Sequence, residues 1–132
     1  MTQPQQSTPE SAPRWFTARQ ILDAVSPRRA RQLLAETLQD GFRPEEDPAR
    51  DNVAAGEGHM LLMPSVLGPW SGIKVASVSP GNPQRGLPRI QATYLLLDTA
   101  TLTVRAMMEG LSLIHISEPT RREWLSRMPS SA

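Results

Sequence analysis

The second half of the sequence contains four apolar runs, and no helix-length segment separates any two of them. They are "HMLLMP" from His59, "GIKVASV" from Gly72, "RIQATYLLLD" from Arg89 and "LTVRAMM" from Leu102. Their content of β-branched and apolar residues is typical of strands. Parallel neighbours require a long crossover connection, usually a helix, so these runs predict a mostly antiparallel sheet.

Two helices are predicted before the sheet. The segment "TARQ", Thr17 to Gln20, fits a capping box at the start of a short helix that contains Ile21, Leu22 and Val25. Ser26 and Pro27 are a typical N-cap and first residue of a second helix, which Gly41 ends. Its apolar residues fall on one stripe: Ala30, Leu33, Leu34 and Leu38. The fold class predicted is α+β, two N-terminal helices followed by the sheet.

Composition sets the remaining boundaries. Residues 1–14 are rich in Gln, Ser, Thr and Pro and predict a disordered tail, and residues 42–58 read mostly as loop. The 14 Lys and Arg residues against 13 acids give a net charge of +1, which favours neither a nucleic acid nor a membrane as partner. The sequence has no cysteine, no signal-peptide pattern and no membrane-spanning apolar run, so we expect a cytoplasmic protein.

Several familiar kinds of site are excluded or weak. His59 has no second His or acid at metal-ligand spacing, so no metal site is predicted. His59 and His115 are the only histidines, and neither lies in a nucleophile motif, so no Ser-His-Asp triad is predicted. Arg28, Arg29 and Arg31 read as a solvated helix face. The run "GEGHML" has two of the three glycines of a dinucleotide fingerprint and opens no helix, so no nicotinamide-binding domain is predicted in this chain.

Two cations are candidates for a binding site. Arg50, in the Pro-flanked loop "DPARD", could hold a carboxylate through two parallel hydrogen bonds, or it could pair with Asp47 or Asp51 at the surface. Lys74 lies inside a strand of apolar and small residues. It is therefore either on the solvent face or desolvated in order to act on a carboxylate, carbonyl or imine.

The run from Arg50 to Gly110 resembles the ornithine cyclodeaminase and mu-crystallin family. With the helices before it, the resemblance covers residues 15–110, which we interpret as one incomplete N-terminal domain. The matching residues, in the order of the family pattern, are Arg50, Met63-Pro64, Gly72, Lys74, Pro80, Asn82, Gly86 to Pro88, and Asp98. Arg89 departs from the Thr that some cyclodeaminases carry near the cofactor, so the resemblance does not identify ornithine as the substrate.

The resemblance implies an NAD(P)-dependent cyclodeaminase, amino-acid dehydrogenase or ketimine reductase that acts on a small amino or imino acid. It implies that Arg50 binds the substrate carboxylate and that Lys74 reaches both the carboxylate and the reacting end, as a substrate-binding and catalytic residue. It also implies a homodimer through the strands, and NAD or NADP on a later Rossmann domain. The chain as given is therefore expected to bind no cofactor and to be inactive. The alternative is a non-catalytic, mu-crystallin-like ligand-binding or dimerisation module.

The last part of the chain, residues 111–132, begins with "LSLIHISEPTR" and stands where the family continues toward the Rossmann domain. The strand-like alternation of this segment matches no family segment, and residues 111–132 resemble the translation of a transposon-based sequencing-library adapter. We therefore interpret residues 111–132 as a non-native tail whose strand pattern is accidental.

Overall fold

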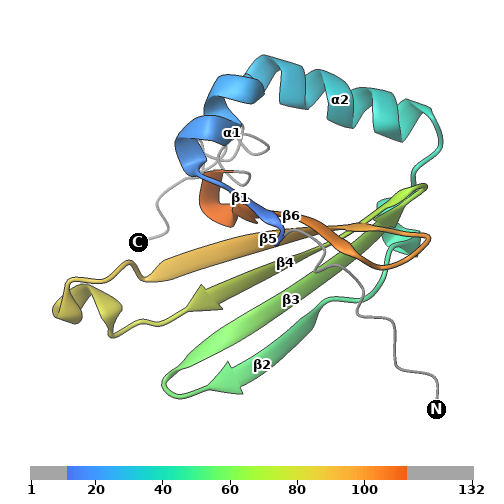
Figure 1. Ribbon diagram of the computed structural model, residues 1–132. Helices are drawn as coiled ribbons and strands as arrows, with labels where there is room; N and C mark the ends of the chain where they lie inside the picture. The colour runs from blue at the N-terminus through green and yellow to red at the C-terminus, as the bar shows by residue number, and fades with distance from the viewer. Residues whose placement is uncertain (1–11, 113–132) are drawn as a thin grey trace, which may run out of the picture.

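The structure is a computed structural model that describes residues 12–112, and within them it has one sheet and two α-helices (Figure 1). The helices are α1 (Ala18–Ala24) and α2 (Pro27–Gln39), with short 3-10 turns at Pro44–Glu46 and Asn82–Arg85. The strands are β1 (Arg14–Phe16), β2 (Asp51–Ala55), β3 (Gly58–Leu67), β4 (Trp70–Val78), β5 (Ile90–Asp98) and β6 (Val104–Glu109). The sheet order is β1-β6-β5-β4-β3-β2.

Every neighbouring pair of strands is antiparallel except β1 and β6. The predicted α+β class, with two helices before a mostly antiparallel sheet, is therefore confirmed. The four apolar runs form β3, β4, β5 and β6. None of the helices between residues 12 and 112 has the length and apolar character needed to cross a bilayer.

The helix starts are those that the sequence predicts. The Thr17 side chain accepts from the Gln20 N–H at 3.3 Å, and the Gln20 side chain accepts from the Thr17 N–H at 2.9 Å, which completes the capping box. The Ser26 hydroxyl accepts from the Arg29 N–H at 3.1 Å and caps α2. The α2 helix ends at Gln39, and Gly41 follows with φ of 102°, a conformation that favours glycine.

The registers of the strands place four side chains in one row across the sheet. Met63 pairs with Lys74, Lys74 pairs with Tyr94, and Tyr94 pairs with Met108. Directly paired residues on neighbouring strands point to the same face of a sheet. Figure 1 shows α1 and α2 on one side of the sheet, and the row lies on that side because its residues share a cavity with both helices.

The opposite face of the sheet is apolar and is covered by no helix among residues 12–112 (Figure 1). The register places on this open face Trp15, Val53, Met60, Leu62, Val66, Ile73, Val75, Leu95, Leu97 and Met107. Val66 is 49% exposed and Trp15 is 45% exposed. The open face is therefore mainly apolar at its centre, with the polar residues Ser71, Ser77, Gln91 and Thr93 toward its ends.

The region before the sheet contains a strand that the sequence did not predict. Residues 42–58 lie mostly outside α-helices and strands, as expected, but Asp51–Ala55 forms β2, which pairs with β3 from Asp51 opposite Leu62 to Ala55 opposite Gly58. All five residues of β2 are exposed, so its sequence lacks the apolar alternation by which a strand is recognised. The strand forms because it hydrogen-bonds to the long edge of β3.

The ends of the chain are described only in part. The expected disordered tail lies outside the described residues except for its last three, 12–14, of which Arg14 begins β1. Of the residues interpreted as a non-native tail, Leu111 and Ser112 continue from Gly110 as a helical turn, and the rest lie outside the described residues. The Glu109 carboxylate accepts from the N–H groups of Leu111 at 2.8 Å and Ser112 at 2.9 Å, which satisfies the start of this turn.

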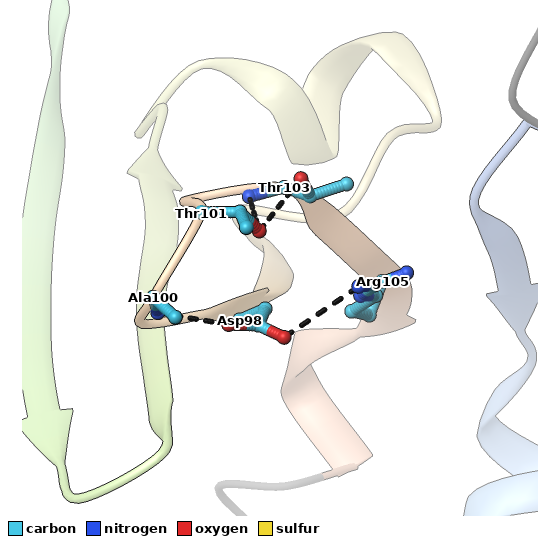
Figure 2. A network of polar contacts seen from close by, with 5 residues as sticks. All are labelled: Asp98, Ala100, Thr101, Thr103 and Arg105. Carbon is cyan, nitrogen blue, oxygen red and sulfur yellow. Dashed lines mark hydrogen bonds and ion pairs between the residues drawn. The ribbon is translucent and has the colours of Figure 1, made fainter.

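A small polar network holds the turn between β5 and β6 (Figure 2). Asp98 accepts from the Ala100 N–H at 2.8 Å and lies 3.5 Å from the Arg105 guanidinium, and the hydroxyls of Thr101 and Thr103 are 2.9 Å apart. Leu102, at the tip of this turn, has φ of 54°. Its left-handed backbone is costly for a residue with a branched side chain.

Candidate ligand-binding site

A cavity of about 600 Å³ lies between the helices and the covered face of the sheet. Its walls are mainly apolar side chains from α1, α2 and the sheet, including Ile21, Val25, Leu33, Leu34, Phe42 and Met108. Five polar side chains also line it, namely Asp47, Arg50, Ser65, Lys74 and Tyr94. An apolar cavity with a few convergent polar groups is the usual form of a small-molecule site.

Arg50 reaches the cavity from the loop that ends where β2 begins. Its alternative role, a surface ion pair with Asp47 or Asp51, is not realised, since Arg50 forms no ion pair with any residue between 12 and 112. Asp47 instead accepts from the Val66 backbone N–H at 3.0 Å. The Arg50 guanidinium is therefore exposed at the cavity and able to receive an anion.

Lys74 lies on the helix-covered face of β4, and its side chain lines the cavity. The sequence left open whether Lys74 lies on the solvent face of the sheet, and the structure places it on the covered face instead. The residue is half-buried. Because Arg50 directly precedes β2, the two cations approach the cavity from strands two positions apart, about 10 Å between backbones at the usual strand spacing.

Tyr94 is a site residue that the sequence reasoning missed. It pairs with Lys74 across β4 and β5, and it is half-buried in the cavity wall. Burial raises the pKa of the Tyr94 phenol above its ordinary value of 10.0, and the nearby negative charge of Asp47 raises this pKa further. The phenol is therefore neutral at physiological pH and available as a hydrogen-bond donor.

The other basic and histidine candidates lie elsewhere. Arg28, Arg29 and Arg31 do not line the cavity. Arg29 lies 3.7 Å from Glu36, and the Arg31 side chain donates to the Pro27 carbonyl at 3.4 Å, as expected of a solvated helix face. His59 is the second residue of β3, and residues 12–112 contain no group of three or more possible metal ligands. His115 lies outside the described residues.

The described residues do not fit a dinucleotide cofactor. Such a site needs a strand that leads through a glycine-rich turn into a helix, whose N-terminus receives the pyrophosphate. Between residues 12 and 112 both α-helices come before β2, so none of the strands from β2 to β6 leads into either of them. Phe16 leads into α1 through Thr17, without a glycine.

Comparison with solved structures finds similar folds at low sequence identity. The Delta(1)-pyrroline-2-carboxylate reductase of Thermococcus litoralis, in complex with NADH and L-proline, superposes with a TM-score of 0.67 and 26% identity over 77% of this chain and 33% of that one. A lysine cyclodeaminase, whose structure concerns recognition of L-lysine, L-ornithine and L-2,4-diaminobutyric acid, superposes with a TM-score of 0.60 and 26% identity. The match covers 79% of this chain and 34% of that one. An archaeal alanine dehydrogenase dimer with bound NAD superposes with a TM-score of 0.66 and 22% identity, over 79% of this chain and 33% of that one.

The chain thus spans about a third of the length of the structures that it matches. No curated protein sequence matches it significantly. A profile of the ornithine cyclodeaminase/mu-crystallin family matches residues 23–116, which include Arg50, Lys74 and Tyr94. Since this match spans most of the chain and agrees with the fold, the chain belongs to the ornithine cyclodeaminase/mu-crystallin family.

Proposed function

We propose that this chain forms the substrate-binding and dimerisation part of an NAD(P)-dependent enzyme that acts on a small amino or imino acid. The observation that carries the proposal is the convergence of Arg50, Lys74 and Tyr94 at one apolar cavity. Two cations and a neutral phenol are a fitting set of partners for a carboxylate and an adjacent amine or imine.

Each of the three polar groups has a distinct task in this proposal. The Arg50 guanidinium binds the substrate carboxylate through two parallel hydrogen bonds. The Lys74 ammonium, on the floor of the cavity, lies against the carboxylate and the reacting carbon, where its charge or its proton acts on the imine. The Tyr94 phenol donates a hydrogen bond beside them, and the apolar walls exclude water and receive the side chain of the substrate.

The similar structures support this interpretation by what they bind. One is a complex with NADH and L-proline, and another concerns the recognition of three diamino acids. The cofactor would supply the hydride acceptor or donor, and residues other than 12–112 would hold it. We propose that the chain as given neither binds NAD(P) nor turns over an amino acid.

The open face of the sheet is the proposed dimer interface. It is apolar over β3, β4 and β5, and it bears no helix among the described residues. Burying such a face against a second copy of itself removes apolar area from water. The alanine dehydrogenase structure is a dimer with the same fold, which is consistent with this assignment.

The test uses a protein of full family length that contains this segment. Arg50→Ala should remove the bidentate grip, at a cost of about 1.5–3 kcal/mol for a charged hydrogen bond, or roughly 10- to 150-fold in kcat/KM. Arg50→Lys is the matched control, which keeps the positive charge and loses the two parallel hydrogen bonds. Its kcat/KM should lie between those of the unchanged protein and Arg50→Ala. Lys74→Ala should lower kcat more than it raises KM.

Unchanged kinetics in Arg50→Ala and Lys74→Ala, with an amino or imino acid as confirmed substrate, would contradict the proposal. If the full-length protein binds the acid through Arg50 and oxidises no NAD(P)H with any cyclic imine, the non-catalytic, mu-crystallin-like binding module is the better interpretation.

A further inference from the structure

A second, smaller recess of about 310 Å³ lies beside the ligand cavity on the same face of the sheet. Its walls are formed mainly by the apolar side chains of Leu67, Trp70 and Leu96. The two spaces have Ser65 and Tyr94 in common. Tyr94 therefore has the ligand cavity on one side and the recess, which we call the Trp70 recess, on the other.

The position of the Tyr94 ring depends on a glycine in the neighbouring strand. Gly72 is buried on β4, two residues before Lys74 and on the same face. A Cβ built at Gly72 would overlap both the hydroxyl and the ring of Tyr94. The ring therefore crosses β4 at the one point where no side chain rises from that strand, between Lys74 and Trp70.

We propose that Tyr94 is a specificity-determining residue, whose ring is a partition that ends the ligand cavity and keeps the ligand out of the Trp70 recess. This inference rests on the proposed function, because it takes the carboxylate to be anchored at Arg50 and Lys74. A ligand held there meets the Tyr94 ring before it can reach Trp70. The site therefore favours carboxylates whose apolar part is short in this direction, and a longer unbranched chain finds its path closed.

Substitutions at Tyr94 distinguish the effect of its ring, which divides the two spaces, from the effect of its hydroxyl. Tyr94→Phe keeps the ring and removes only the hydroxyl, so the two spaces stay separate. Tyr94→Ala and Tyr94→Leu leave nothing long enough to cover Gly72, so they join the two spaces. Gly72→Ala keeps the phenol but forces the ring away from its place, so it should resemble Tyr94→Ala in ligand preference.

Trp70 supplies a reporter inside the recess. The full chain has three tryptophans, Trp15, Trp70 and Trp124, so labelling with 5-fluorotryptophan gives three fluorine resonances, and Trp70→Phe assigns the one from Trp70. The probes are butanoate and octanoate, titrated into the 132-residue chain, with circular dichroism to show that each variant is folded. Tyr94→Leu, which retains more apolar volume, takes the place of Tyr94→Ala if the latter does not fold.

In the unchanged chain and in Tyr94→Phe, concentrations of octanoate that saturate the Arg50 site should leave the Trp70 resonance in place. In Tyr94→Ala and Gly72→Ala the Trp70 resonance should move with the same midpoint as binding, and adding Arg50→Ala should abolish the response. Each newly buried methylene strengthens binding about fourfold. The preference for octanoate over butanoate should thus rise by more than about tenfold relative to Tyr94→Phe.

The outcomes distinguish this inference from the function beneath it. If Arg50→Ala does not weaken butanoate binding, the carboxylate site itself is wrong. If Arg50→Ala does weaken it while Tyr94→Ala changes neither the Trp70 response nor the chain-length preference, only the partition is wrong. A titration with 1-octanol, which needs no cation, judges the partition separately: equal affinity in Tyr94→Ala and Tyr94→Phe would overturn it.

Discussion

At the scale of single residues, the Tyr94 phenol holds its proton more firmly than an exposed tyrosine does. Burial is the larger cause and the charge of Asp47 the smaller one. Asp47 is itself held in place by the hydrogen bond from the Val66 N–H. A neutral donor beside two cations adds directionality to the site without adding repulsion toward a carboxylate.

Tyr94 is the chain's only tyrosine, so absorbance of the phenolate titrates this residue alone. We expect its midpoint above the ordinary 10.0 in the folded chain. Asp47→Asn should lower the midpoint, because it removes the negative charge while its amide oxygen can still accept from the Val66 N–H. Circular dichroism at each pH checks that the chain is folded, and a midpoint that stays in place in Asp47→Asn would contradict the assigned cause.

The same shift fixes the direction of a stability effect. In the unfolded chain the phenol ionises near 10.0, whereas in the folded chain it ionises at a higher pH. The stability that this residue contributes is complete below pH 10 and is lost as the pH rises from there through the folded pKa. Between pH 9 and pH 11, the urea midpoint of unfolding should therefore fall more for the unchanged chain than for Tyr94→Phe. An equal fall in the two chains would refute this linkage.

Leu102 offers a second test on one residue. Its φ of 54° is unfavourable for leucine, and its side chain is 64% exposed, so it contributes little packing. Leu102→Asn should stabilise the turn by about 1 kcal/mol, because asparagine tolerates the left-handed region. Thermal unfolding measures the gain. Leu102→Val, which is β-branched and less tolerant of this backbone, should lose stability instead.

At the scale of elements, the features that could be predicted are those whose signal lies in a few adjacent residues. The capping box at Thr17 and the Ser26-Pro27 start of α2 are read from a few adjacent residues, and both are as expected. The β2 strand is fully exposed and depends on its neighbour β3, so nothing in "DNVAA" reveals it. The three-residue β1 strand is too short for a periodic pattern.

The candidate site follows the same division. Arg50 and Lys74 were identified from their chemistry and from the family resemblance, whereas the role of Tyr94 depends on the register of β4 against β5 and on the bare backbone at Gly72. Register is a long-range property that a strand's own sequence does not state. The pattern G-x-K, with a glycine on the same face as the lysine, is the signal that could have pointed to a large side chain from the next strand.

The capping box makes the first helix testable. Thr17→Ala should destabilise the chain by about 1 kcal/mol, because it leaves the Gln20 N–H without its acceptor and breaks the reciprocal pair. Thr17→Ser retains the hydroxyl and should restore most of that loss. Urea unfolding compares the three chains, and equal midpoints would show that α1 is held by packing at Ile21 alone.

At the scale of the whole molecule, a single sheet separates two surfaces of different purpose. The covered face holds the cavity, and the open face is proposed to meet a second copy. Val66 is 49% exposed on the open face, so Val66→Lys is tolerable in a monomer, but it would bury an unpaired charge in a dimer. We expect it to weaken dimerisation by more than about tenfold.

Analytical ultracentrifugation over a range of concentrations measures this effect in the 132-residue chain. Leu38→Lys is the control, since it adds the same charge on α2, which lies on the opposite side of the sheet from the open face. A dimer of unchanged strength in Val66→Lys, or an equal loss in Leu38→Lys, would place the interface elsewhere.

The alternation along each strand has a consequence for how such a protein can change. Ile73 and Lys74 are neighbours in sequence, as are Tyr94 and Leu95, yet the members of each pair lie on opposite faces. Substitution can therefore alter ligand choice and partner choice independently, one position at a time. Inserting or deleting one residue within β4 or β5 would exchange the two faces and ruin both at once. A change in the number of strand residues is thus more damaging to this domain than a change in the identity of one of them.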